Sequence, residues 1–262
     1  MKKLIASFSI AAMTSGFMGV VPALAATSLS QVQPGDLIRG TSLTAVYYYG
    51  KDGFRYVFPN DKTYFTWYSN FNTVKTLSDA DLGKIQLGGN VTYKPGVKML
   101  KINSDPKTYA VDAGGTLRWV TSEAAAVALY GSNWNKMIDD VPDAFFGNYK
   151  QGGADIASGS DFNKSSVMAD ATDIGHDKNL QYPKYVDIMS SGFGGSIDIS
   201  VGQSVKFTNK DSVDHTATAD DLSWGTGTLK PGESFTKAFK KPGVYTFFDS
   251  LKPANTGVVN VQ

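Results

Sequence analysis

The sequence predicts a multi-domain protein in which an α+β tandem-repeat domain is followed by an all-β sandwich. Residues 26–150 contain two similar aromatic-rich segments, residues 151–183 are polar and rich in Gly, Ser and Asp, and residues 184–262 contain short alternating strands separated by turns. Apolar and polar residues alternate in half-buried strands, and several such strands at close spacing are typical of a sandwich. We therefore expect a signal peptide at 1–25, the repeat domain at 26–150, a linker at 151–183 and the sandwich at 184–262.

The first 25 residues have the features of a secretory signal peptide. An apolar stretch follows Lys2 and Lys3, and Ala23-Leu24-Ala25 supplies small residues at a cleavage position. No later run approaches the roughly 20 apolar residues that a membrane-spanning helix needs. We expect cleavage after Ala25, export, and a bacterial protein that is secreted or held at the cell surface, with no membrane span after the signal is removed.

The composition excludes several kinds of chemistry. The chain has no cysteine and only two histidines, His176 and His215. Disulfides, thiolate nucleophiles and cysteine metal ligands are therefore absent, and a Ser-His-Asp triad is not expected. The formal net charge of +1 becomes −1 once Lys2 and Lys3 leave with the signal. We expect no nucleic-acid partner, because such partners need a basic surface, and no enzymatic activity.

The aromatic region has the pattern of a duplication. Residues 55–57 (Arg-Tyr-Val) align with residues 118–120 (Arg-Trp-Val), and 71–72 (Phe-Asn) align with 134–135 (Trp-Asn) at the same offset. Each copy predicts a hairpin followed by short helices, one of them capped by Ser122. The pattern resembles tandem repeats of bacterial cell-surface and secreted proteins. One copy alone could hardly bury its apolar side, so we expect the two copies to pack together.

Aromatic residues of the repeats are candidates for ligand contact, because tyrosine and tryptophan combine a large apolar surface with a polar group. Alternation along the strands predicts that Tyr47 and Tyr49, with the facing Tyr56 and Phe58, belong to the core. The residues that we expect to point away from the core, and to be available to a glycan or a surface protein, are Tyr48, Arg55, Trp67 and Trp119.

The C-terminal region carries three motifs in a fixed order. "VGQSVKFTNKDSVDHTAT" is followed by "LKPGESFTKAFKKPGVYTFF" and by a closing "GVVNV". In this order they resemble the cupredoxin family, the blue-copper proteins of the plastocyanin and azurin type. The resemblance covers nearly all of residues 184–262. It implies a Greek-key β-sandwich with a copper ion held by two histidines, a cysteine and a methionine.

Three of the four copper-ligand positions implied by this resemblance are altered. His215 matches the first histidine, whereas Asp249 stands at the cysteine position, Lys252 at the second histidine position and Asn255 at the methionine position. A blue-copper centre needs a thiolate and two imidazoles, so we expect none here and predict no cofactor. His215 and Asp249 are candidates for a remnant metal site. The interpretation we favour is an ion pair between Asp249 and Lys252, with His215 hydrogen-bonded nearby.

These observations predict an exported, non-enzymatic binding or structural protein with a degenerate, copper-free cupredoxin-like domain. Its partner would be a glycan, a surface protein or a second copy of the chain, the last through an exposed strand edge. The alternative is a copper-binding or electron-transfer protein that uses an altered, non-blue site. A glycan-active enzyme built on paired carboxylates is a third alternative.

Overall fold

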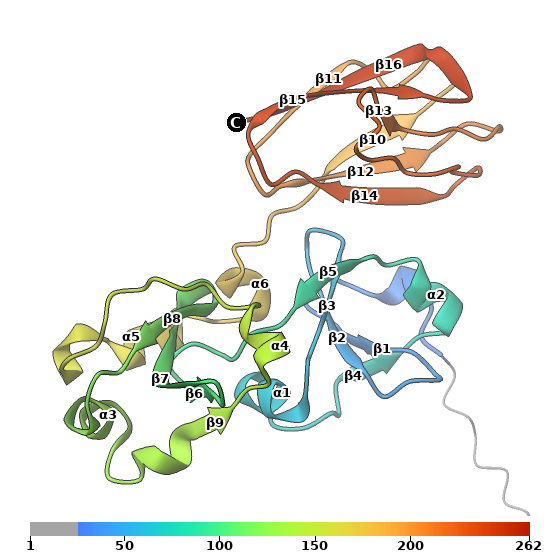
Figure 1. Cartoon of the computed structure of the whole chain (residues 1–262). Coiled ribbons are helices and arrows are strands. Elements are labelled where there is room, and N and C mark those ends of the chain that lie inside the picture. The colour runs from blue at the N-terminus through green and yellow to red at the C-terminus, as the bar shows by residue number, and fades with distance from the viewer. Residues whose placement is uncertain (1–25) are drawn as a thin grey trace, which may run out of the picture.

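The computed structural model describes residues 26–262, which form four β-sheets with a few short helices (Figure 1). The expected signal peptide, residues 1–25, lies outside the described residues. Within the described part of the chain, no helix is long and apolar enough to cross a lipid bilayer.

The first sheet has five strands in the order β4–β1–β2–β3–β5. The central strand β2 is antiparallel to β1 and β3, and the two outer strands, β4 and β5, run parallel to β1 and β3 respectively. The elements of this part are β1 (Leu37–Arg39), β2 (Val46–Tyr49), β3 (Arg55–Val57), α1 (Asp61–Trp67), β4 (Val74–Thr76), α2 (Asp79–Gly83) and β5 (Leu87–Asn90), preceded by a 3-10 turn at Leu29–Gln31.

The second sheet has four strands in the order β8–β7–β6–β9. Strand β6 is antiparallel to β7 and parallel to β9, and β7 is antiparallel to β8, which is the pairing pattern of β1, β2, β3 and β4 in the first sheet. Its elements are β6 (Met99–Ile102), β7 (Asp105–Asp112), β8 (Thr116–Trp119), α3 (Glu123–Tyr130), β9 (Ile138–Asp140) and α4 (Asp143–Phe146), with 3-10 turns at Ala113–Gly115 and Trp134–Met137.

Local sequence signals fix several of these elements. The turn between β2 and β3 contains Gly53 at φ +88°, and the turn between β7 and β8 contains Gly114 at φ +64°, a region that glycine enters without steric cost. Helix α3 begins after Ser122, whose side chain accepts a hydrogen bond from the backbone N–H of Ala125, as expected of an N-cap.

The polar segment 151–183, expected as a linker, is largely folded onto the first two sheets. It contains a 3-10 turn at Gly159–Asp161 and two short helices, α5 (Lys164–Asp170) and α6 (Ile174–Asp177). Ile156 and Phe162 are buried beside the second sheet, and Ile174 is buried against the first. Few apolar residues serve this packing and they are widely spaced, so the segment shows no periodicity in the sequence.

Residues from 184 onward form two facing sheets, and the predicted β-sandwich is confirmed (Figure 1). One sheet has the order β10–β12–β14 and the other the order β11–β16–β15–β13. Phe207, Phe239 and Phe247 fill the space between them and are almost fully buried. The strands are β10 (Lys184–Ile188), β11 (Ser196–Ile199), β12 (Ser204–Asn209), β13 (Thr218–Ala219), β14 (Ser234–Ala238), β15 (Gly243–Asp249) and β16 (Lys252–Val261).

Two hydrogen bonds join the sandwich to the first sheet. The hydroxyl of Ser204 donates to the backbone carbonyl of Asp52 at 2.9 Å, and the backbone N–H of Thr236 donates to Oε1 of Gln86 at 2.7 Å. Because β14 lies at the edge of its sheet, the N–H of Thr236 has no strand partner on that side. Gln86 therefore satisfies a backbone donor that the fold would otherwise bury unpaired.

Candidate functional site

His215 and Asp249 meet at one end of the sandwich. His215 lies between β12 and β13, where its backbone pairs with Leu229, and Asp249 is the last residue of β15. Nδ1 of His215 is 2.6 Å from Oδ2 of Asp249, and Nε2 is 3.0 Å from Oδ2 of Asp211. Both ring nitrogens therefore face carboxylates. The side chains of His215 and Asp249 are 2% and 0% exposed, so this contact is shielded from water.

The surroundings favour the charged form of both groups. Oδ1 of Asp249 accepts hydrogen bonds from the backbone N–H groups of Thr216 and Leu251, each at 3.0 Å. Burial raises the pKa of Asp249, but the hydrogen bonds from His215 and these N–H groups outweigh it, and the net pKa is lowered. Burial likewise lowers the pKa of His215, but the hydrogen bonds to Asp249 and Asp211 dominate, and the net pKa is raised. The result is a buried ion pair.

The expected ion pair between Asp249 and Lys252 is replaced by this contact. Lys252 is exposed, and its Nζ donates to the backbone carbonyl of Ser190 at 2.6 Å. Asp249 and Lys252 are partners across the β15–β16 hairpin, but the register shifts at Asp249, and the lysine side chain leaves the site. Asn255 is buried at 9% exposure, and its Nδ2 has no hydrogen-bond partner.

These residues do not fit a blue-copper centre. The chain has no thiolate to offer, and both nitrogens of His215 are engaged by carboxylates. The unpaired atom of Asn255 is an amide N–H donor, which does not ligate a cation. Across residues 26–262, no group of three or more His, Cys, Asp or Glu side chains is arranged to hold a metal ion.

The solved structures that match this chain each cover about a third of it. No family model matches the chain, and no curated protein matches it. A purple cupredoxin from Nitrosopumilus maritimus is 28% identical over 30% of this chain and 99% of that chain, with a TM-score of 0.28. A Cu-containing nitrite reductase from Thermus scotoductus is 28% identical over 32% of this chain and 23% of that chain, with a TM-score of 0.30. An amicyanin mutant with Cu(I) is 21% identical over 30% of this chain and 82% of that chain, with a TM-score of 0.29.

These comparisons correct the expectation that the chain takes no cofactor. The matched structures are described as a cupredoxin, a Cu-containing reductase and a Cu(I) amicyanin. Copper is named for two of these structures, whereas the residues present in this chain do not fit a blue-copper centre. The absence of enzymatic activity stays a prediction for this chain.

Three of the four aromatic and basic residues that we expected to contact a ligand make hydrogen bonds within the fold instead. Tyr48 is 4% exposed, and its hydroxyl accepts from the N–H of Gly175 and donates to Asp173. The Arg55 guanidinium donates to the carbonyl of Leu82, and the indole N–H of Trp67 donates to the carbonyl of Thr92. Tyr48 corrects the expected alternation: the first sheet is covered on both faces, so residues of both parities on β2 are buried or half-buried.

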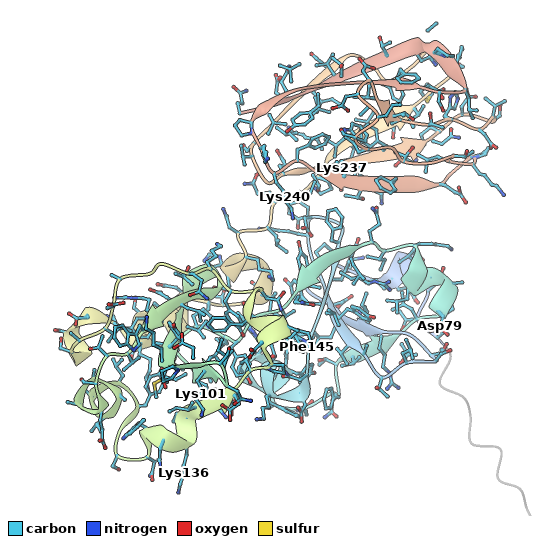
Figure 2. All side chains as sticks on the ribbon, in the orientation of Figure 1. Asp79, Lys101, Lys136, Phe145, Lys237 and Lys240 are labelled. Atoms are coloured by element: carbon cyan, nitrogen blue, oxygen red, sulfur yellow. The ribbon has the colours of Figure 1, made fainter. Side chains whose placement is uncertain are left out.

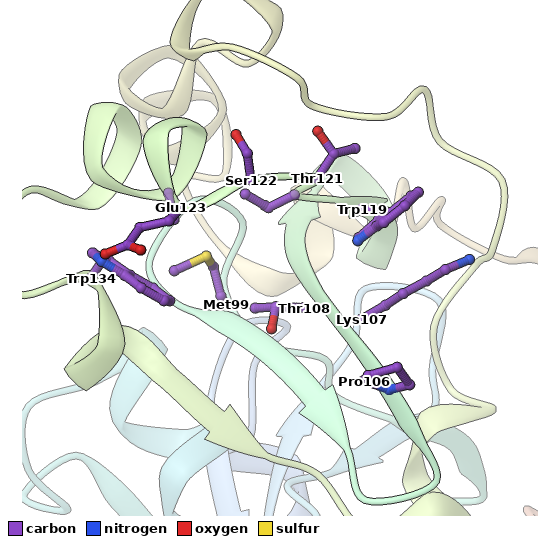
Figure 3. Close-up of a pocket in the computed structure, with 11 residues that line it drawn as sticks. Met99, Pro106, Lys107, Thr108, Trp119, Thr121, Ser122, Glu123 and Trp134 are labelled. Carbon is purple, nitrogen blue, oxygen red and sulfur yellow. The ribbon is translucent and has the colours of Figure 1, made fainter.

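Trp119, the fourth candidate, lines an open pocket of about 330 Å³. Figure 3 shows Trp119 and Trp134 on opposite sides of this pocket, with Met99 and Thr108 between them. Nζ of Lys107 lies 4.7 Å from the centre of the Trp119 ring, within range of a cation–π contact. Polar groups at the rim come from Thr121, Ser122 and Glu123. Trp134 was not among the residues predicted to contact a ligand. Its alignment with Phe71 marks a shared position in the two copies without showing that it borders a cavity.

Proposed function

We propose that the protein is an exported, non-enzymatic binding protein that holds a sugar ring in the pocket between Trp119 and Trp134. The observation that supports this most is the pocket itself: two half-buried indoles border a cavity with hydroxyl and carboxylate groups at its rim. Apolar walls with a few convergent polar groups are typical of small-molecule sites. A pyranose ring needs both, because its C–H faces are apolar and its hydroxyls are polar.

A comparison of the two sheets of the repeat region supports the same proposal. Their common strand order and pairing favour an interpretation as tandem copies. In the first copy, the residue aligned with Trp119 is Tyr56, which is buried, and the residue aligned with Trp134 is Phe71, which stacks on Tyr64 at 4.3 Å. The two aligned rings of the first copy therefore do not form a counterpart of the tryptophan pair that borders the pocket of the second copy.

Calorimetric titration of the mature protein with a panel of neutral oligosaccharides tests this function. We expect at least one saccharide to bind, and Trp119→Ala to weaken its binding at least tenfold, about 1.4 kcal/mol. Tyr185→Ala is the matched control, since Tyr185 is 67% exposed on the sandwich and outside the pocket. Absence of binding across the panel, or equal loss in both variants, would overturn the proposal.

Cu(II) binding at His215 is a second candidate function. It is favoured by one observation: Nδ1 of His215 and Oδ2 of Asp249 lie 2.6 Å apart, so a metal ion that displaces the proton between them would meet one nitrogen and one carboxylate oxygen. Nitrogen and carboxylate oxygen ligands suit Cu(II) in a tetragonal, non-blue site. Titration with Cu(II) and Zn(II) should then show micromolar binding that disappears in His215→Ala. Binding that is absent, or indifferent to this change, excludes the site.

A further inference from the structure

A cleft of about 580 Å³ lies where the sandwich approaches the first sheet. Its walls come from β3, β5, the segment 178–181 and β14. Figure 2 shows Lys237 and Lys240 on the side of the sandwich that faces the rest of the chain. The lining contains four lysines in all: Lys150, Lys178, Lys237 and Lys240.

Among residues 26–262, none of these four lysines forms a salt bridge. Within residues 26–262, salt bridges closer than 4.0 Å involve other lysines, and no carboxylate oxygen lies within that distance of any of the four ammonium groups. The chain is close to neutral overall, so this gathering of positive charge is local.

The carboxylates near the cleft are satisfied by neutral donors. Asp52 accepts hydrogen bonds from the hydroxyl of Tyr56 and the backbone N–H of Phe54. Asp177 accepts from the backbone N–H of Gly114 at 2.7 Å. Burial raises the pKa of both carboxyl groups, which weakens any compensation that they offer to the lysines.

Lys178 is the least favourably placed of the four cations. It is half-buried, and its Nζ lies 5.1 Å from the centre of the Tyr56 ring. Burial lowers its pKa, and the neighbouring ammonium of Lys150 lowers it further, although Asp177 and Asp52 act in the opposite direction. An ammonium held away from water beside a like charge is stabilised when an anion enters the site.

The rest of the lining indicates what kind of anion would fit. Phe54, Tyr56 and Phe235 contribute apolar ring surface. Amide groups that can donate and accept hydrogen bonds come from the other side chains: Gln86, Asn179 and Gln181. Cations, amides and flat apolar surface correspond to the carboxylates, hydroxyls and C–H faces of an acidic sugar. The volume also falls within the range of small-molecule sites and exceeds what a single inorganic ion needs.

We propose that this cleft binds an oligosaccharide that carries carboxylate groups, and that Lys150, Lys178, Lys237 and Lys240 pair with those carboxylates. The site is separate from the pocket of Trp119, so the proposal does not depend on sugar binding there. A free inorganic oxyanion shares the charge chemistry and is distinguished by the experiment.

The test is calorimetry on the mature full chain with hexagalacturonate at low ionic strength. Its fully methyl-esterified form has the same rings without charge, and inorganic sulfate has charge without rings. We expect the acid to bind, the ester to bind at least tenfold more weakly, and added salt to weaken binding of the acid. Equal binding of acid and ester, or no binding of the acid, overturns the proposal. Sulfate binding as tight as that of the acid overturns its oligosaccharide part and leaves a small-anion site.

Two lysine variants connect this binding to the cleft. Lys178→Met should weaken binding of hexagalacturonate at least tenfold, whereas Lys178→Arg, which keeps the charge, should retain most of it. Lys136→Met removes an equal charge from an exposed position distant from the cleft and should leave binding unchanged (Figure 2). If Lys136→Met weakens hexagalacturonate binding as much as Lys178→Met does, binding depends on the net charge of the protein, and the proposed site is wrong. Trp119→Ala should leave this titration unchanged, which separates a failure here from a failure of the proposed function.

Discussion

Two regions of this chain gather charged side chains, and they differ in what neutralises those charges and in how far they are buried. At the end of the sandwich, the ring nitrogens of His215 meet Asp249 and Asp211, and Asp249 also accepts two backbone N–H groups. In the cleft beneath the sandwich, four lysines have no carboxylate within salt-bridge distance in the described chain.

This difference separates a structural role from a binding role. Removing a charge from water is unfavourable unless a partner compensates for it. The histidine–aspartate network supplies its own partners, so loss of one member leaves the others unpaired. In the lysine cleft Lys178 is partly buried beside the like charge of Lys150 and has no salt bridge within residues 26–262, so a ligand of opposite charge would stabilise it. The predictions that follow test this contrast from its largest expected effect to its smallest.

The largest effect is expected from Asp249→Ala. This change leaves His215 and the N–H groups of Thr216 and Leu251 without their acceptor, and breaking a buried pair in this way costs about 3–5 kcal/mol. Urea unfolding of the mature protein measures the loss. Asp187→Ala is the control, because Asp187 is exposed on β10 of the same sandwich. A loss below about 1 kcal/mol would show that the network contributes little to stability. The His215 network would then have no structural role to contrast with the lysine cleft.

A smaller loss is expected from Gln86→Ala at the junction between the first sheet and the sandwich. The substitution removes the acceptor of the Thr236 N–H, and an unsatisfied buried donor costs about 1–3 kcal/mol. Because Thr236 and Gln86 both line the cleft, the same variant should also weaken hexagalacturonate binding. Unchanged stability and unchanged binding together would indicate that the two parts are not held together through this contact.

The sequence predicted the strands of the sandwich well, but it predicted only in part which polar side chains pair with each other at the end of the sandwich. The alternating strands and the turns between them define the two sheets, and the order of the motifs locates His215, Asp249, Lys252 and Asn255. The choice of partner for Asp249 depends on a register shift in the β15–β16 hairpin, which turns Lys252 toward Ser190. Sequence spacing does not encode that direction.

The cleft and the pocket depend even more on tertiary structure. The lysines of the cleft come from positions 150, 178, 237 and 240, which no local pattern connects. The burial of Tyr48 has a similar cause, because alternation distinguishes two faces of a strand and cannot show that both faces of the sheet are covered. Trp119 was among the candidates because we expected it to point away from the core, and it borders the pocket of the second sheet.

The pH dependence of stability should report the His215 network with a defined sign. The pKa of His215 is raised above its ordinary value of 6.5 in the folded state, so its contribution is complete below pH 6.5 and is lost as the pH rises through the folded pKa. The pKa of Asp249 is lowered from 3.8, so its contribution is present above pH 3.8 and is lost as the pH falls through the folded pKa.

The stability difference between wild type and His215→Asn should therefore be greatest between about pH 4 and 6.5 and should shrink toward pH 9. Urea unfolding at pH 5.5, 7.5 and 9 measures this difference, and the subtraction removes the contributions of other titrating groups. The subtraction reports His215 alone, so the change should be smaller than the loss caused by Asp249→Ala. A difference that grows with pH would mean that His215 is held in its neutral form.

The smallest change in the free energy of unfolding is expected from Lys178→Met, and it is the small size of this change that supports the comparison. The substitution removes a cation–π contact with Tyr56, worth about 0.5–1 kcal/mol, but it also removes a desolvated charge that has no salt-bridge partner in the described chain. These terms oppose each other, so the free energy of unfolding should stay within about 1 kcal/mol of wild type. Hexagalacturonate should then raise the unfolding temperature of wild type more than that of the variant, because a ligand that binds only the folded state stabilises it by RT ln(1 + L/Kd), where L is the free ligand concentration, and this quantity increases as Kd falls. A loss approaching that of Asp249→Ala would show that Lys178 has a structural partner, and the two regions would no longer differ in kind.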